Sequence, residues 1–119
     1  MKELLEYREK LIARIEEAAQ EFCAACESFG DPFTKVEGEW TVHQIASHTR
    51  DVDKMVYGER IRRTLNEENP EFKSFDADEW MAANYSKDEP VQKIVRDFLT
   101  NIQELCKTLQ AAPREACRV

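Results

Sequence analysis

The chain has 119 residues, which fits one domain spanning residues 1–119 and leaves no room for two. It contains three glycines and four prolines, so we expect few breaks and long regular elements. A formal charge of −7 argues against general nucleic-acid binding, which draws its affinity from neutralising phosphates. No segment approaches the roughly 20 apolar residues of a membrane span. The acidic N-terminus lacks the apolar run of a signal peptide, so we expect a cytoplasmic protein with no membrane partner.

The first predicted element is a long helix over residues 3–29. Its apolar residues recur at alternating spacings of three and four, which places them on one stripe of a helix. These residues are Leu4, Leu11, Ile15, Ala18, Phe22, Ala25 and Phe29. Gly30 supplies a helix stop, and a loop is expected over residues 30–39.

The start of a second helix is marked by a capping box. Thr41 occupies the N-cap, and Gln44 stands at the position that returns a hydrogen bond to it. Trp40 and Ile45 occupy the positions of a hydrophobic staple around this cap. The pattern predicts a helix over residues 42–65.

A long connection over residues 66–89 separates the second helix from a third, predicted over residues 90–111. Within the connection, Asp76 and Glu79 form a second capping pattern, which predicts a short helix over residues 77–84. Five apolar residues suggest that the connection packs onto the helices: Phe72, Phe75, Trp80, Met81 and Tyr85. With no convincing strand, the fold class is all-α.

The four cysteines carry little functional signal. Cys23 and Cys26 form a C-x-x-C inside a helical pattern, where they share a face, and are interpreted as small buried hydrophobes. A redox or structural zinc role is the alternative for this pair. Cys106 lies on the apolar stripe of the third helix and is interpreted in the same way, whereas Cys117 lies in a polar tail that predicts nothing for it.

Helix geometry separates the two histidines. The face of His43 is polar, since it holds Ser47, Arg50 and Lys54, so His43 is expected to point to solvent. The face of His48 is apolar, since it holds Ile45, Val52 and Met55, so His48 is expected to point toward the bundle interior. Asp51 lies three residues further on and is expected to flank His48. From spacing alone, His48 is either a satisfied core residue or a metal ligand.

The segment around His48 resembles the second-helix motif of the DinB/YfiT-like superfamily of metal-dependent enzymes. The shared features are Trp40 followed by Thr41, then His48 eight residues after the tryptophan and Asp51 three further on. The stretch over residues 75–80 resembles the family's loop motif, in which an acidic residue precedes a tryptophan. In order and spacing, the resemblance extends over roughly residues 1–112.

The resemblance implies a four-helix bundle with a metal pocket at one end. In the family, a divalent ion, often nickel or zinc, is held by three histidines. Position 48 matches the ligand on the second helix, and the other two belong to an H-x-x-x-H on the fourth helix. Family activities include thiol-dependent S-transfer and isomerisation with low-molecular-weight thiols, and many members are classed only as hydrolases, so the resemblance implies a small-molecule substrate. Asp51, Tyr57 and Trp80 are then expected to lie beside the ion or to line its pocket.

This chain departs from the family pattern because it lacks the H-x-x-x-H and the fourth helix. It is either a truncated member, a member that pairs through the open apolar groove, or one that kept the fold and lost the chemistry. The intact second-helix motif favours the first explanation. The sequence therefore predicts a metal-dependent hydrolase or thiol transferase with His48 as one ligand. The alternative is a non-catalytic helical interaction module that forms a homodimer through the groove.

Three further features have alternative interpretations. The basic cluster over residues 60–63 complements a helix dipole or, in part, binds an anion such as a thiol cofactor's carboxylates. Tyr57, Trp80 and Tyr85 are core aromatics or line a pocket. Asp76 is interpreted as an N-cap rather than an acid catalyst.

Overall fold

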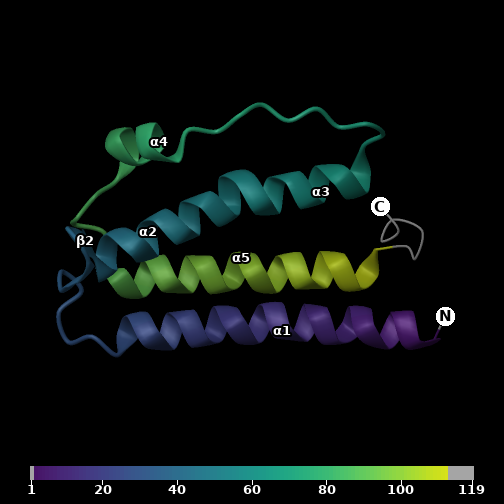
Figure 1. Cartoon of the computed structure of the whole chain (residues 1–119), viewed down its shortest axis with the longest axis horizontal. Helices are drawn as coiled ribbons and strands as arrows, with labels where there is room; N and C mark the ends of the chain where they lie inside the picture. The colour runs from purple at the N-terminus through teal and green to yellow at the C-terminus, as the bar shows by residue number, and fades with distance from the viewer. Residues whose placement is uncertain (1, 113–119) are drawn as a thin grey trace.

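The computed structural model describes residues 2–112 and is mostly helical, which confirms the all-α class. Three long helical segments lie side by side, with the third of them in the middle (Figure 1). These segments are α1 (Lys2–Glu27), the continuous run of α2 (Val42–Val52), η1 (Asp53–Gly58) and α3 (Glu59–Asn66), and the central α5 (Val91–Ala111). No helix among the described residues is both long and apolar enough to cross a bilayer.

The core lies between α5 and its two neighbours. The predicted apolar stripe of α5 is confirmed, since its buried residues are Ile94, Val95, Phe98, Ile102, Leu105 and Cys106. The stripe predicted for α1 contacts α5 only in part: Phe22 packs against Phe98, whereas Leu4 is 64% exposed and Leu11 is 48% exposed. The buried residues of α1 are instead Ile12, Ala19, Cys23 and Cys26. These residues are mostly small, so they carry a weaker apolar signal than the exposed leucines and phenylalanines while allowing closer approach of the two helices.

The interpretation of Cys23, Cys26 and Cys106 as buried residues is confirmed. The Sγ of Cys23 lies 3.4 Å from the carbonyl oxygen of Val95, and the Sγ of Cys106 lies 3.7 Å from that of Ile12. Burial is the main cause that raises the pKa of all three thiols. They are therefore protonated near neutral pH and join α1 to α5 by packing. Cys117 lies outside the described residues.

A small hairpin occupies the segment predicted as a loop. β1 (Lys35–Glu37) pairs antiparallel with β2 (Trp40–Thr41), which contradicts the expectation that the chain contains no strand. Gly38 turns the chain between them with a φ of +57°, in the left-handed region that favours glycine. Strands of three and two residues are too short to show the alternation by which strands are predicted.

The predicted capping box begins α2. The Thr41 hydroxyl accepts a hydrogen bond from the Gln44 backbone N–H at 3.1 Å, and the Gln44 side chain accepts one from the Thr41 N–H at 2.9 Å. Two of the otherwise unpaired amide groups at the helix start are thereby satisfied. The box fixes where the helix starts and hence how its histidines are directed.

The helix predicted over 42–65 runs to Asn66 but is not regular. Six residues in its middle form the π-helical segment η1. At the end of η1, a Cβ on Gly58 would lie 3.0 Å from the carbonyl oxygen of Asp53, so glycine permits the close backbone approach of this wide turn. The spacing of apolar residues in the sequence gives no indication of this π turn.

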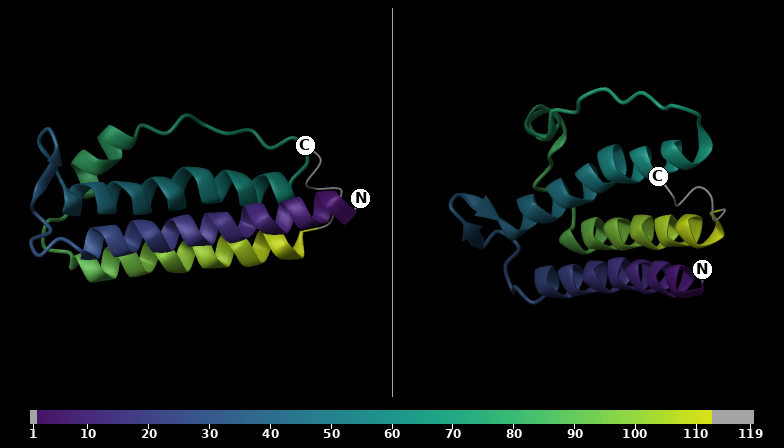
Figure 2. Two further views of the ribbon diagram at one scale, coloured as in Figure 1. Left: turned by 60° about the horizontal axis from the view of Figure 1, so that its bottom comes forward. Right: turned by 45° about the vertical axis from the view of Figure 1, so that its right-hand side comes forward.

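The crossover connects α3 to α5 and carries α4 (Ala77–Asn84), at the predicted bounds. The carboxylate of Asp76 accepts a hydrogen bond from the Glu79 N–H at 3.0 Å, so Asp76 is the predicted N-cap. Figure 2 shows the extended part of the crossover along the outside of α3. There, the guanidinium groups of Arg60 and Arg63 lie 5.6 and 5.1 Å from the Phe72 ring centre.

We expect the substitution Thr41→Ala to lower the free energy of unfolding by about 1 kcal/mol, because it removes the N-cap acceptor. Urea denaturation monitored by circular dichroism measures the change. Thr64→Ala is the matched control, since Thr64 is exposed in α3, and a change within about 0.5 kcal/mol is expected there. Equal losses in the two variants would contradict a capping role.

Candidate functional site

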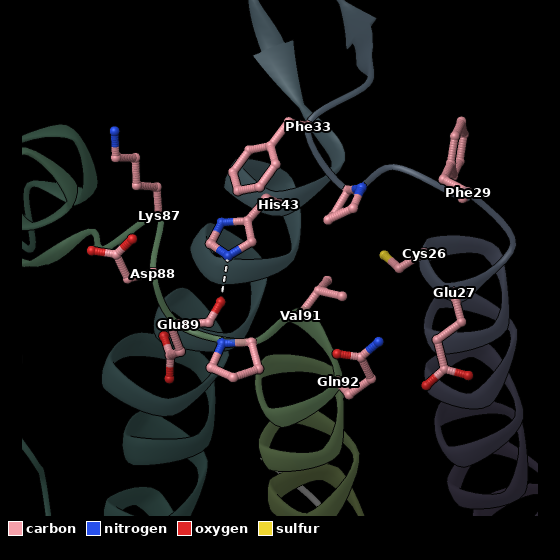
Figure 3. Close-up of a pocket in the computed structure, with 13 residues that line it drawn as sticks. Cys26, Glu27, Phe29, Phe33, His43, Lys87, Asp88, Glu89, Val91 and Gln92 are labelled. Carbon is pink, nitrogen blue, oxygen red and sulfur yellow. Dashed lines mark hydrogen bonds between the residues drawn. The ribbon is translucent and has the colours of Figure 1, made fainter.

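His43 is buried at the end of the bundle, with 1% of its surface exposed. Its Nδ1 lies 2.7 Å from the Tyr85 hydroxyl. Its Nε2 lies 2.6 Å from the Glu89 carbonyl oxygen, the bond drawn as a dashed line in Figure 3. The Phe33 ring stacks on the imidazole, with ring centres 5.0 Å apart. The prediction that His43 points to solvent is therefore wrong.

The partners of His43 fix its tautomer. A carbonyl oxygen only accepts, so Nε2 must donate its proton to Glu89. In the neutral ring, Nδ1 then accepts from the Tyr85 hydroxyl. Burial raises the pKa of Tyr85, which keeps this hydroxyl protonated and able to donate. Both ring nitrogens of His43 are thus committed to structural bonds.

The polar face that holds His43 is turned inward as far as Arg50, whereas Lys54 beyond it is exposed. Ser47 is buried, and the Arg50 side chain is only 14% exposed. Arg50 donates to the Glu89 carboxylate at 2.6 Å and to the Asp51 carboxylate at 3.0 Å. The polar groups of α2 are buried because they pair with the crossover, whose partners lie too far along the chain for helix spacing to reveal them.

Glu89 has the most strongly shifted pKa of these groups. The hydrogen bond from Arg50, helped by Lys93 at 2.9 Å, lowers the pKa of Glu89 from 4.5 to about 2, although partial burial acts in the opposite direction. Glu89 contributes its carbonyl to His43 and its carboxylate to Arg50. This one residue therefore ties the start of α5 to two positions on α2.

Asp51 does not flank His48 in the predicted way. One carboxylate oxygen accepts from Arg50, and the other accepts from the Trp80 indole N–H at 3.2 Å. The structure thus brings together two of the predicted site residues, Asp51 and Trp80. Their bond fastens α4 to α2 rather than orienting the histidine.

His48 is half-buried and differs chemically from His43. Its ring lies edge-on to Trp40, with ring centres 5.6 Å apart. Among the described residues, neither of its ring nitrogens has a hydrogen-bond or ion-pair partner. His48 and Trp40 line an open depression of about 430 Å³, together with Glu37, Gly38 and Ile45. The His48 imidazole is therefore held in place by Trp40, while its two ring nitrogens have no hydrogen-bond partner within residues 2–112.

Tyr57 is 62% exposed on η1, so its interpretation as a core aromatic is wrong, while its role as a pocket residue stays a prediction. The π turn changes the phase of the helix before this position, which helix spacing cannot anticipate. Arg63 of the basic cluster pairs with Glu67 at 2.8 Å near the C-terminal end of α3. This position agrees with the dipole interpretation of the cluster.

A cavity of about 290 Å³ lies beside His43, between the end of α1 and the start of α5 (Figure 3). Apolar side chains, including Phe29, Phe33 and Val91, form much of its wall, and Cys26 opens onto it. The pKa of Cys26 is raised, first by burial and then by Cys23 and Glu27. This cavity thus holds a protonated thiol and an imidazole whose nitrogens are already bonded.

Metal-ligating side chains are dispersed over the described residues. Within residues 2–112, no three histidine, cysteine, aspartate or glutamate side chains gather into a ligand set. Comparisons with known proteins found no matching family model, no similar curated protein and no similar solved structure.

Sequence reasoning missed the contacts of Tyr85, Glu89 and Trp40. Tyr85 was considered only as a core or pocket aromatic, and Glu89 only as the end of a connection. For Trp40, the available signals are its staple position beside the N-cap and its spacing of eight residues from His48, and neither indicates that the two rings touch. No local spacing indicates the two long-range partners of His43.

We expect His43→Ala to cost about 3 kcal/mol of stability, because it leaves a cavity and removes the partner of two polar groups. His48→Ala should cost less than about 1 kcal/mol, since its ring is half-exposed and makes no hydrogen bond within residues 2–112. Chemical denaturation of both variants measures the difference. A larger loss in the His48 variant would contradict the assigned roles.

The lowered pKa of Glu89 predicts an acid-dependent loss of stability. Its contribution is fully present above the unfolded pKa of about 4.5 and is lost as the pH falls toward about 2. Glu89→Gln should therefore be less stable than the parent chain at pH 7, and the difference should shrink as the pH falls through this window. Urea denaturation at several pH values measures it; a difference that stays constant down to pH 2 would be inconsistent with the Arg50 pairing.

Proposed function

We propose that this chain is the helical part of a metal-dependent enzyme of the DinB/YfiT-like type, a hydrolase or thiol-dependent S-transferase. His48 is one ligand of its divalent ion, nickel or zinc. The observation that carries the proposal is the contrast between the two histidines. His43 uses both ring nitrogens in structural bonds, whereas neither nitrogen of His48 has a partner among the described residues.

The surroundings of His48 suit a ligand role. A ligating imidazole must be neutral, must be held in orientation and must be open on the metal side. Trp40 holds the ring by its edge, and the depression in front of it also contains the acidic residue Glu37. Since a mononuclear site takes three or four protein ligands, the proposal requires further ligands from outside the described residues.

Asp51 and Trp80 support this site indirectly. Their hydrogen bond holds α4 against the helix that carries His48, one turn further along. We assign them as positioning residues that keep the crossover closed over this part of α2. When bound, the ion would lower the pKa of a coordinated water or thiol and so generate a nucleophile at neutral pH.

A second candidate is the non-catalytic helical interaction module. It is favoured by a different observation, namely the large apolar side chains that α1 leaves exposed, including Leu4 and Leu11. Exposed apolar surface of this kind is typical of interaction sites. The two candidates use different parts of the molecule, so each is tested separately.

The two histidines provide an internal control for metal binding. Titration with Ni²⁺, followed by NMR of the imidazole protons, should broaden the His48 signals and saturate at one ion per chain. The His43 signals should persist, because its nitrogens are buried and bonded. His48→Gln should abolish the saturable effect. If the His48 signals are unaffected, or broaden without saturating, His48 is not a ligand of a specific site.

A further inference from the structure

An apolar stripe runs along α1 beside the residues that pack on α5. We name this stripe the α1 seam; it consists of Leu4, Leu11, Ile15, Ala18, Phe22 and Ala25, and it continues just past the end of the helix with Phe29. All of these residues are exposed except Phe22, which is half-buried because its ring packs edge-on against Phe98 of α5, with ring centres 5.4 Å apart. Their alternating spacing of four and three is the repeat of a helix that packs lengthwise against another helix. A surface helix without such a partner normally places polar residues on this side.

One position in the repeat of the α1 seam, Arg8, is charged, and its guanidinium points to the end of α5. Arg8 falls between Leu4 and Leu11, and its guanidinium donates to the carbonyl oxygens of Leu109 and Ala112 at the end of α5. These carbonyls lie at the negative end of the α5 dipole, which favours a cation. The α1 seam is therefore apolar along its length.

The charges of α1 are divided between its two halves. Residues 2–14 contain four basic and three acidic residues, whereas residues 15–27 contain four acidic and no basic residues. Two copies of this helix lying parallel would place acidic half against acidic half. Two copies lying antiparallel would place each acidic half against the basic half of the other, which favours the antiparallel arrangement.

We propose that the α1 seam binds the α1 seam of a second copy in antiparallel orientation, giving a two-fold symmetric dimer. Centring the symmetry axis between Ile15 and Ala18 lets the seams overlap along their full length. Each Ile15 then meets Ala18 of the second copy. Large side chains thus face smaller ones at the centre, as close packing of two helices requires.

The same register places a charged pair beside the centre. Arg14 and Glu21 are one heptad apart on the flank of the α1 seam, so each Arg14 lies near Glu21 of the second copy. Within residues 2–112, the ion pair of Arg14 is an exposed one with Glu17 at 3.4 Å. The pair is thus free to form across the interface, and it forms twice because of the symmetry.

Analytical ultracentrifugation over a range of concentrations tests the dimer. We expect the full chain to dimerise, and Ile15→Glu to remain monomeric at concentrations where the parent chain is dimeric. Val36→Glu is the matched control, because Val36 is a similarly exposed aliphatic residue in the hairpin, away from α1, and should leave the dimer intact. Unchanged helicity by circular dichroism shows that each variant is folded.

Charge reversal tests the antiparallel register. Arg14→Glu alone and Glu21→Arg alone should each weaken the dimer about tenfold, since each replaces two attractions by two repulsions. The double variant should recover the affinity of the parent chain. A parent chain that stays monomeric, a dimer that survives Ile15→Glu, or a double variant that does not recover would overturn the proposal. Because the metal titration monitors His48, failure of either proposal is distinguishable from failure of the other.

Discussion

The arrangement of the described residues depends on the burial of one imidazole. A ring as buried as that of His43 is tolerated only when both nitrogens are paired, because an unpaired polar group in the interior costs about 1–3 kcal/mol. The two partners lie 42 and 46 residues further along the chain. Pairing them brings the end of the crossover onto the start of α2 and fixes where α5 begins. The ion pair between Arg50 and Glu89 and the bond between Asp51 and Trp80 extend the same attachment.

Local chemistry predicted most of the helical fold. Capping residues gave the starts of α2 and α4, and the apolar spacing gave α5 nearly to the residue. The prediction for His43 is wrong because the partners that bury it are distant in sequence, so a polar helix face does not have to be a solvent face. The inward side of α1 was misassigned because small residues such as Ala19 carry little apolar signal. The hairpin and the π turn are too local and too irregular for periodicity to detect.

The molecule separates structural and reactive roles between similar side chains. His43 and His48 lie little more than one turn apart on the same helix, yet only the former is fully hydrogen-bonded within the described residues. The proposed chemistry therefore falls to His48 and the open side of α2. The proposed self-association belongs to α1, and the central helix α5 lies between them (Figure 1). Substitutions on α1 can thus alter the proposed self-association, while α2 stays available for the proposed metal binding.

The π-helical segment η1 has a consequence for how this helix tolerates change in length. An α-helix turns by about 100° per residue, so a one-residue insertion in a regular helix would rotate everything beyond it relative to the core. A π turn absorbs one additional residue locally. In η1 the additional residue fits because the backbone of Gly58 lies close to the carbonyl oxygen of Asp53. In α3, which follows, the guanidinium groups of Arg60 and Arg63 then lie over the Phe72 ring. Removing one residue between 52 and 59 would restore a regular helix but turn this aromatic contact away from its partner.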